Sequence, residues 1–203
     1  MATALNRRDE IPNKELAQRI VDDKDEGAVE ELIENLGHKD KNIQSDCIKV
    51  LDEISERCPG LTARYYKEIG ILLESKNNRL VWGAMSALDG ITLEAPKGIY
   101  NMLAKILQAA DKGSVITKDH AVGILIKLAS LKQYANTCMP LLMEQLASSP
   151  NNQFPMYAEK TSVLIDKKNK EIFREIVLGR LKRFEKESQK KRVIRVLKLV
   201  ENR

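Results

Sequence analysis

The sequence predicts an all-α protein built from about five consecutive helix pairs. Aliphatic side chains must fill most of the core, because 43% of the residues are hydrophobic but only 4% are aromatic. Ten glycines and six prolines among 203 residues leave too little turn chemistry for many β-hairpins. A third observation is an apolar pattern that returns after every 33 to 39 residues, which predicts a repeat with one helix pair in each unit.

The repeat is most visible in five apolar residue pairs, each of which ends in leucine. These leucines are separated by 37, 37, 39 and 33 residues: Leu51, Leu88, Leu125, Leu164 and Leu197. Another apolar residue follows three positions later in four of the five segments, whereas Lys167 stands at that position in the fourth. The spacing predicts that the five leucines are buried at equivalent positions on the second helix of each pair.

The first helices of the pairs lie between these segments. Leu103, Ile106 and Leu107, for example, have the i, i+3, i+4 spacing of a helix with one buried face. We therefore expect a single repeat domain over residues 1–203. It should contain an N-terminal helix at 13–24 and helix pairs near 26–57, 60–94, 96–131, 133–166 and 168–201.

Capping residues support this division of the chain. Pro96 and Pro155 suit the first turns of helices, where the missing amide hydrogen would have no partner in any case. Asp40, Asn78 and Ser188 have short polar side chains that can accept hydrogen bonds from the free amides of a first turn. We predict these three residues as N-caps of second helices.

The second helices resemble those of HEAT-repeat proteins. A HEAT helix of this kind has a small residue, then an Ala-Leu pair and a further apolar residue, a pattern matched best by Ala84, Ala87, Leu88 and Ile91. The arginine often found early in that helix is replaced by Gln44, Val81 and Lys118, and the proline that often bends the first helix appears only as Pro140. The resemblance implies a right-handed α-α superhelix (α-solenoid) of about five HEAT-like helix pairs. It also implies a non-enzymatic scaffold or adaptor that binds a protein or peptide on a concave face lined by second helices.

One patch of side chains is the candidate partner-binding site on that face. At about 100° per residue, four residues point away from the stripe defined by Ala84 and Leu88: Arg79, Trp82, Ser86 and Asp89. Trp82 is the only tryptophan and is suited to act as a binding anchor. The alternative is that Trp82 packs against a neighbouring second helix, because aromatic side chains are usually at least partly buried.

The C-terminal segment is the candidate site for a polyanion. Residues 1–60 have a net charge of −6, whereas residues 167–203 have a net charge of +9. The candidate phosphate-binding cluster consists of Lys182, Arg183, Lys186, Lys190, Lys191, Arg192 and Arg195. The alternative, which we favour, is that these charges only keep the outer face of a terminal repeat solvated.

An alternative function follows from a second resemblance. HEAT-like stacks also form alkylpurine DNA glycosylases, in which a basic concave face meets DNA and aromatic residues flank a carboxylate. Here Trp82 and Asp89 share a helix face, but they are two turns apart and a second tryptophan is lacking. A nucleic-acid-binding HEAT-like protein is therefore the runner-up interpretation, behind a protein-binding or peptide-binding scaffold.

We predict no catalytic residues, no metal site and no cofactor. His120 and the adjacent Asp119 diverge by about 100° on a helix, and a lone histidine such as His38 or His120 is more often an ordinary polar or core residue than a metal ligand. The three cysteines Cys47, Cys58 and Cys138 form no C-x-x-C motif, and we expect buried free thiols. Without an apolar signal core or membrane-spanning run, we expect a cytoplasmic protein with no membrane partner.

Overall fold

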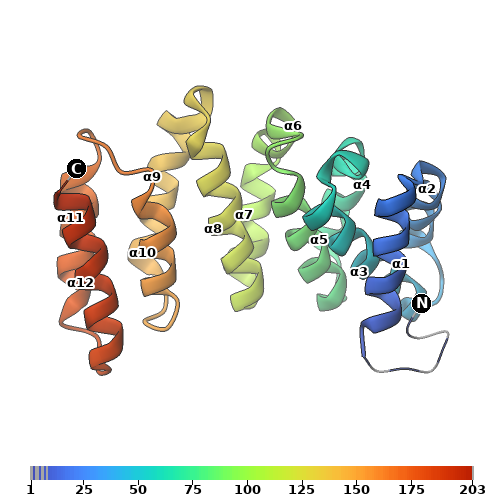
Figure 1. The fold of residues 1–203 in the computed structure, drawn as a ribbon, viewed down its shortest axis with the longest axis horizontal. Coiled ribbons are helices and arrows are strands. Elements are labelled where there is room, and N and C mark those ends of the chain that lie inside the picture. The colour runs from blue at the N-terminus through green and yellow to red at the C-terminus, as the bar shows by residue number, and fades with distance from the viewer. Residues whose placement is uncertain (1, 3–4, 6, 8, 203) are drawn as a thin grey trace. The chain divides into compact units, whose positions relative to one another are not determined.

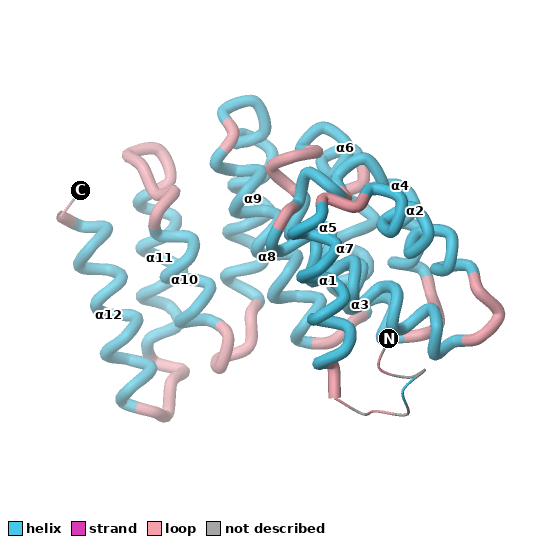
Figure 2. Tube along the Cα trace, turned by 45° about the vertical axis from the view of Figure 1, so that its right-hand side comes forward, coloured by secondary structure: helices cyan, strands magenta, loops and turns pink. Residues whose placement is uncertain are grey.

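The structure is a computed structural model that describes residues 2, 5, 7 and 9–202. The described residues form α-helices and short 3₁₀ turns and contain no strand, so the all-α prediction is confirmed (Figures 1 and 2). The helices are α1 Ile11–Asp23, α2 Glu26–Glu34, α3 Lys41–Arg57, α4 Tyr66–Ile71, α5 Asn78–Ile91, α6 Pro96–Asn101, α7 Leu103–Lys112, α8 Val115–Ser130, α9 Lys132–Ser148, α10 Phe154–Ser162, α11 Lys170–Leu181 and α12 Glu187–Glu201. Within the described part of the chain, no helix is both long enough and apolar enough to cross a membrane.

The helices divide into two compact units, Met1–Ile124 and Leu125–Arg203, and α8 crosses from the first into the second. In the first unit α1 packs on α3 and α3 packs on α5, while α2 contacts α3 and α4 contacts α5. In the second unit α9 packs against α11 and α10 packs against α12, while α9 contacts α10 and α11 contacts α12. Each unit thus contains two rows of helices. The single repeat domain over 1–203 stays a prediction.

The leucines at the repeat spacing occupy the core in four of the five predicted helix pairs. Leu51, Leu88 and Leu125 are completely buried, and Leu197 is 8% exposed. The prediction is wrong for Leu164, which is only half-buried because α10 ends at Ser162 and Leu164 lies in the following turn.

A polar turn explains why the fourth repeat departs from the pattern. Asp166 Oδ1 accepts hydrogen bonds from the amides of Lys168 and Asn169 at 2.8 and 3.3 Å, and Asn169 Oδ1 accepts one from the amide of Asp166 at 2.9 Å. Such side-chain bonds compete with helical backbone bonds. Ile165, 8% exposed, is buried in place of Leu164.

The predicted caps are partly confirmed. Asp40 Oδ1 accepts a hydrogen bond from the Asn42 amide at 2.8 Å, as predicted for an N-cap. The cap of α5 is Asn77 rather than Asn78, because the side chain of Asn77 reaches the Arg79 amide at 3.1 Å. The prediction for Ser188 is wrong, since α12 begins one residue earlier at Glu187. Pro96 and Pro155 stand in first turns, as expected.

A buried carboxylate joins α1 to α3. The side chain of Glu53 is 8% exposed, and its oxygens lie 2.8 Å from Lys49 Nζ, 2.7 Å from Arg57 Nη2 and 4.0 Å from Lys14 Nζ. Burial raises the pKa of Glu53, but the ion pairs with Lys49, Arg57 and Lys14 outweigh this effect and leave the pKa below its ordinary value. The ionised form is therefore the one that stabilises the native state.

This ion-pair cluster makes stability depend on acid pH. A carboxyl whose pKa is lowered by folding contributes its full stabilisation above the unfolded pKa of about 4.3 and loses it as the pH falls toward the folded value. We expect Glu53→Gln to lower the free energy of unfolding at pH 7 by about 1–2 kcal/mol. This loss is larger than that for breaking an exposed ion pair and smaller than that for breaking a fully buried one. In urea unfolding, the difference between the variant and the wild type should shrink below about pH 4.3. A difference that stays constant down to pH 2 would contradict this account.

Candidate functional site

The first unit contains a groove along α5, which we call the α5 groove. Its volume is about 280 Å³, and its walls come from α3, α5 and the first half of α8, with Glu10 at one end. The lining residues are Glu10, Ser45, Ile48, Lys49, Asp52, Arg79, Trp82, Gly83, Ser86, Ile116 and His120. The lining of the α5 groove therefore combines apolar and charged side chains.

Three of the four residues in the predicted partner-binding patch line this groove. Arg79, Trp82 and Ser86 stand on the face of α5 opposite Ala84 and Leu88, both of which are completely buried. The helical period explains this division, because residues 3, 4 and 7 positions apart share a face. Trp82 is half-buried and borders the groove, and its role as a binding anchor stays a prediction.

Asp89, the fourth predicted residue, contacts a residue that lines the groove. Its Oδ2 forms a hydrogen bond with Nδ1 of His120 at 3.0 Å, and His120 lines the groove. The two residues are 31 positions apart and stand on different helices. Sequence reasoning missed this contact, because it compared His120 only with the adjacent Asp119.

The charged side chains of the α5 groove are paired with one another. Arg79 Nη2 lies 3.1 Å from Glu10 Oε1, and Lys49 Nζ lies 2.9 Å from Asp52 Oδ2. Burial lowers the pKa of Lys49, but its hydrogen bonds with Glu53 and Asp52 outweigh that effect and leave the pKa raised. Lys49 is therefore charged at neutral pH, and the groove presents both charge signs at fixed positions.

Two glycines bring the helices around the groove close together. A Cβ atom at Gly83 would lie 2.6 Å from Cγ1 of Ile48 on α3, and one at Gly123 would lie 2.6 Å from Oδ2 of Asp89. Real Cβ atoms do not approach other atoms so closely. The missing side chains thus let α5 pack against α3 and let α8 approach the carboxylate of Asp89.

Comparison with known proteins places this arrangement among helical-repeat folds. No protein-family model matches the sequence, and no curated protein matches it. A designed armadillo repeat protein, solved in complex with the peptide (KR)4, is similar with a TM-score of 0.67 at 14% identity, over 91% of this chain and 85% of that one. The chain has a helical-repeat fold. Two engineered proteins are similar with TM-scores of 0.66 and 0.65 at 17% and 16% identity, over 99% and 98% of this chain and 95% and 96% of theirs.

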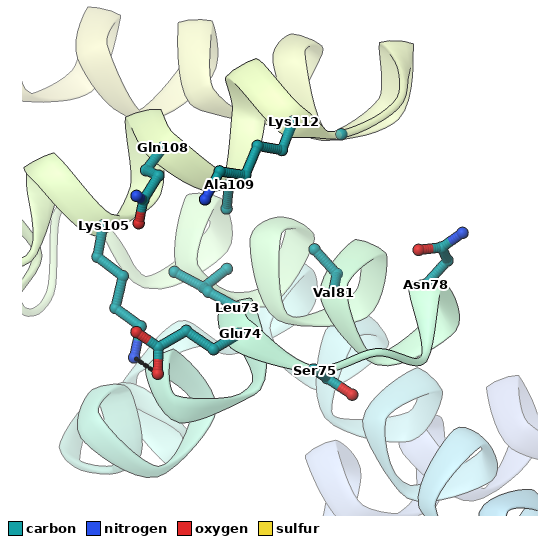
Figure 3. Close-up of a pocket in the computed structure, with 10 residues that line it drawn as sticks. Leu73, Glu74, Ser75, Asn78, Val81, Lys105, Gln108, Ala109 and Lys112 are labelled. Atoms are coloured by element: carbon teal, nitrogen blue, oxygen red, sulfur yellow. Dashed lines mark ion pairs between the residues drawn. The ribbon is translucent and has the colours of Figure 1, made fainter.

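A second opening in the first unit of this helical-repeat fold contains no predicted site residue. It measures about 300 Å³ and lies between the turn after α4, the start of α5 and α7. Figure 3 shows the side chain of Lys105 reaching Glu74, and these two residues form an ion pair at 3.3 Å. Leu73 and Val81 supply apolar surface beside this pair. The described residues that line this opening include no aromatic side chain.

The predicted polyanion cluster occupies the second unit of the helical-repeat fold. Lys182, Arg183 and Lys186 lie between α11 and α12, and Lys190, Lys191, Arg192 and Arg195 lie on α12. Lys190 is paired with Glu187 at 2.7 Å, and Arg192 donates two hydrogen bonds to Glu159. Phe173 and Phe184 are buried and offer no exposed ring for base stacking. Two of the seven cations are thus partly neutralised by carboxylates of the chain itself.

The thiols of the helical-repeat fold are free, and two of the three are buried. Burial, with a smaller contribution from Asp46, raises the pKa of Cys47 to about 11, and burial also raises the pKa of Cys138. Both thiols are protonated at neutral pH and are poor nucleophiles. Cys58 is half-buried. Among the described residues, no group of three or more His, Cys, Asp or Glu side chains is placed to hold a metal ion.

Proposed function

We propose that this protein is a non-enzymatic interaction scaffold that binds an extended segment of a partner protein in the α5 groove. The observation that carries the proposal is the position of Trp82, which is half-buried and borders a groove instead of filling the core. Partly exposed tryptophans flanked by charged side chains are frequent anchors in protein interfaces. The fold supports the same conclusion, because a designed armadillo repeat protein of similar fold was solved with a bound peptide.

The dimensions of the groove favour a peptide over a small molecule. A volume of about 280 Å³ is at the lower limit of small-molecule sites, which usually range from about 300 to 1,000 Å³. It is sufficient for one or two side chains of an extended segment, whose backbone would remain outside the groove. Ile48 and Ile116 provide further apolar surface beside Trp82.

We further propose that the inserted side chain is basic. Two carboxylates line the groove, Glu10 and Asp52, and they are paired with the lining cations Arg79 and Lys49. Two further carboxylates, Glu53 and Asp89, bind the lining residues Lys49 and His120, so that the four carboxylates outnumber the two cations. A lysine or arginine above the indole ring would gain a cation–π interaction and could share the carboxylates of Glu10 and Asp52. The N-terminal 60 residues have a net charge of −6, which would attract a basic segment. The designed armadillo repeat protein of similar fold was solved with the basic peptide (KR)4.

Trp82→Ala tests the anchor. We expect this change to weaken binding of a fluorescein-labelled (KR)4 peptide by more than about 1 kcal/mol, the usual threshold for an important interface residue. The cost in unfolding free energy should stay well below the roughly 3–5 kcal/mol typical of a fully buried aromatic side chain. Fluorescence anisotropy and urea unfolding on the same preparation measure the two quantities.

Two controls make the experiment specific. Tyr65→Ala removes another half-buried aromatic side chain of the first unit, outside the groove, and should leave the affinity unchanged. A (GS)4 peptide should not bind, because it lacks cations. If Trp82→Ala unfolds the protein, Trp82 is not the binding anchor. If the wild type does not bind (KR)4, the proposed preference for basic segments is wrong.

A further inference from the structure

The second unit contains a larger and more apolar groove, which we call the α9 groove. It measures about 850 Å³ and is lined by the end of α8, by α9, by the turn after α10 and by the first turn of α11. Its apolar lining includes Met139, Met143, Leu164 and Ile172. Ile172 is 54% exposed and therefore adds accessible apolar surface to the groove.

Two local features of this unit border the groove. Leu164 lies in a turn because α10 ends at Ser162, so its side chain borders the groove instead of joining the core. Pro140 lies inside α9 and has no amide hydrogen, so it cannot donate the usual helical bond to the carbonyl of Asn136. Both Pro140 and Asn136 line the groove.

The ionic groups of the groove are unbalanced. Lys132 and Lys168 line it and are exposed, whereas Asp166 is the only acidic residue among the described residues that line it. The carboxylate of Asp166 already accepts hydrogen bonds from the amides of Lys168 and Asn169. The groove thus combines apolar surface with two cations, and the charge complementary to it is negative.

From these contacts we infer that the α9 groove binds an acidic amphipathic segment of a partner protein. Apolar side chains of that segment pack on Met139, Met143 and Ile172, and its carboxylates pair with Lys132 and Lys168. Methionine side chains adapt to irregular apolar partners, which suits a groove that accepts a peptide face. The inference does not depend on the α5 groove, since the two grooves share no residue and prefer opposite charges.

Peptide selection on the full chain tests this inference. Random 16-residue peptides displayed on phage are selected on the wild type, after removal of those that bind the double variant Lys132→Glu/Lys168→Glu. We expect the retained peptides to combine Asp or Glu with Leu, Met or Phe. The most enriched peptide, synthesised with fluorescein, should bind the double variant and Ile172→Ser at least about tenfold more weakly than the wild type.

Matched variants and competitors give the remaining outcomes. Lys160→Glu, which reverses an exposed cation of α10 outside the groove, should retain the wild-type affinity for that peptide. Because the substituted lysines are exposed, thermal melting should show folded variants. The inference is overturned if only basic or uncharged peptides are retained, or if Lys160→Glu weakens binding equally. It is also overturned if a single-stranded oligonucleotide displaces the peptide, or if sedimentation shows that the groove is occupied by a second copy of the chain.

Discussion

Leu88→Ala is expected to lower the free energy of unfolding of the first unit by about 2–5 kcal/mol, the range for truncation of a buried leucine. Leu88 is completely buried on α5, a helix that packs against both α3 and α4. Removal of its side chain deletes apolar contacts and leaves a cavity that rigid neighbouring helices fill only in part. Urea unfolding followed by circular dichroism measures the change, with the slope of the transition as a check on cooperativity.

Leu164→Ala is the matched control for this prediction. Both leucines occupy the same position in the sequence repeat, but Leu164 is half-buried in a turn. Its truncation should cost less than about 1.5 kcal/mol, because most of the lost area is already in contact with water. Equal costs at the two positions would show that the repeat spacing, and not the local structure, determines burial.

Arg180→Met is the second change with a large expected effect. Arg180 is 7% exposed, and its guanidinium donates hydrogen bonds to the carbonyls of Ala147 and Ser149 and to Oδ1 of Asn151, at 2.7, 2.5 and 2.9 Å. It also lies 4.8 Å from the ring centroid of Phe154. These contacts join α11 to the segment between α9 and α10. Burial, followed by repulsion from Arg183, lowers the pKa of Arg180.

Methionine keeps much of the apolar volume of the arginine but donates no hydrogen bonds. The acceptors around Arg180 would then lose their partners, at a cost of about 1–3 kcal/mol for each one that is cut off from water. We expect a total loss of about 2–4 kcal/mol in the unfolding free energy of the second unit. Arg180→Lys should recover only part of this loss, because an ammonium cannot reproduce the planar fork of the guanidinium.

Arg183→Met is the control for the effect of charge. Arg183 is exposed, and its removal deletes one nearby cation without deleting the hydrogen bonds made by Arg180. The expected change in unfolding free energy is within about 0.5 kcal/mol. If Arg180→Met were equally mild, the buried guanidinium would not hold α11 in place.

The candidate binding site could be predicted from the sequence to the extent that it depends on one helix. Arg79, Trp82 and Ser86 share a face because residues 3, 4 and 7 positions apart align on an α-helix, whatever packs against that helix. The contribution of Glu10 and His120 to the same groove could not be predicted, because these residues come from distant segments of the chain. The pairing of Asp89 with His120 likewise depends on the close approach of α8 to α5 at Gly123.

Four features could be derived from the amino-acid sequence alone: the all-α class, the approximate helix positions, the burial of Leu51, Leu88, Leu125 and Leu197, and the polar face of α5. These features follow from the 3.6-residue period and from local capping chemistry, both of which act over a few residues. Three other features depend on how the helices pack: Trp82 is half-buried, Arg180 is buried among exposed cations, and Leu164 borders a groove. Those outcomes depend on which helices meet and where a turn interrupts one of them. The burial of a side chain depends on which residues pack around it, and its position in a periodic sequence pattern does not specify these neighbours.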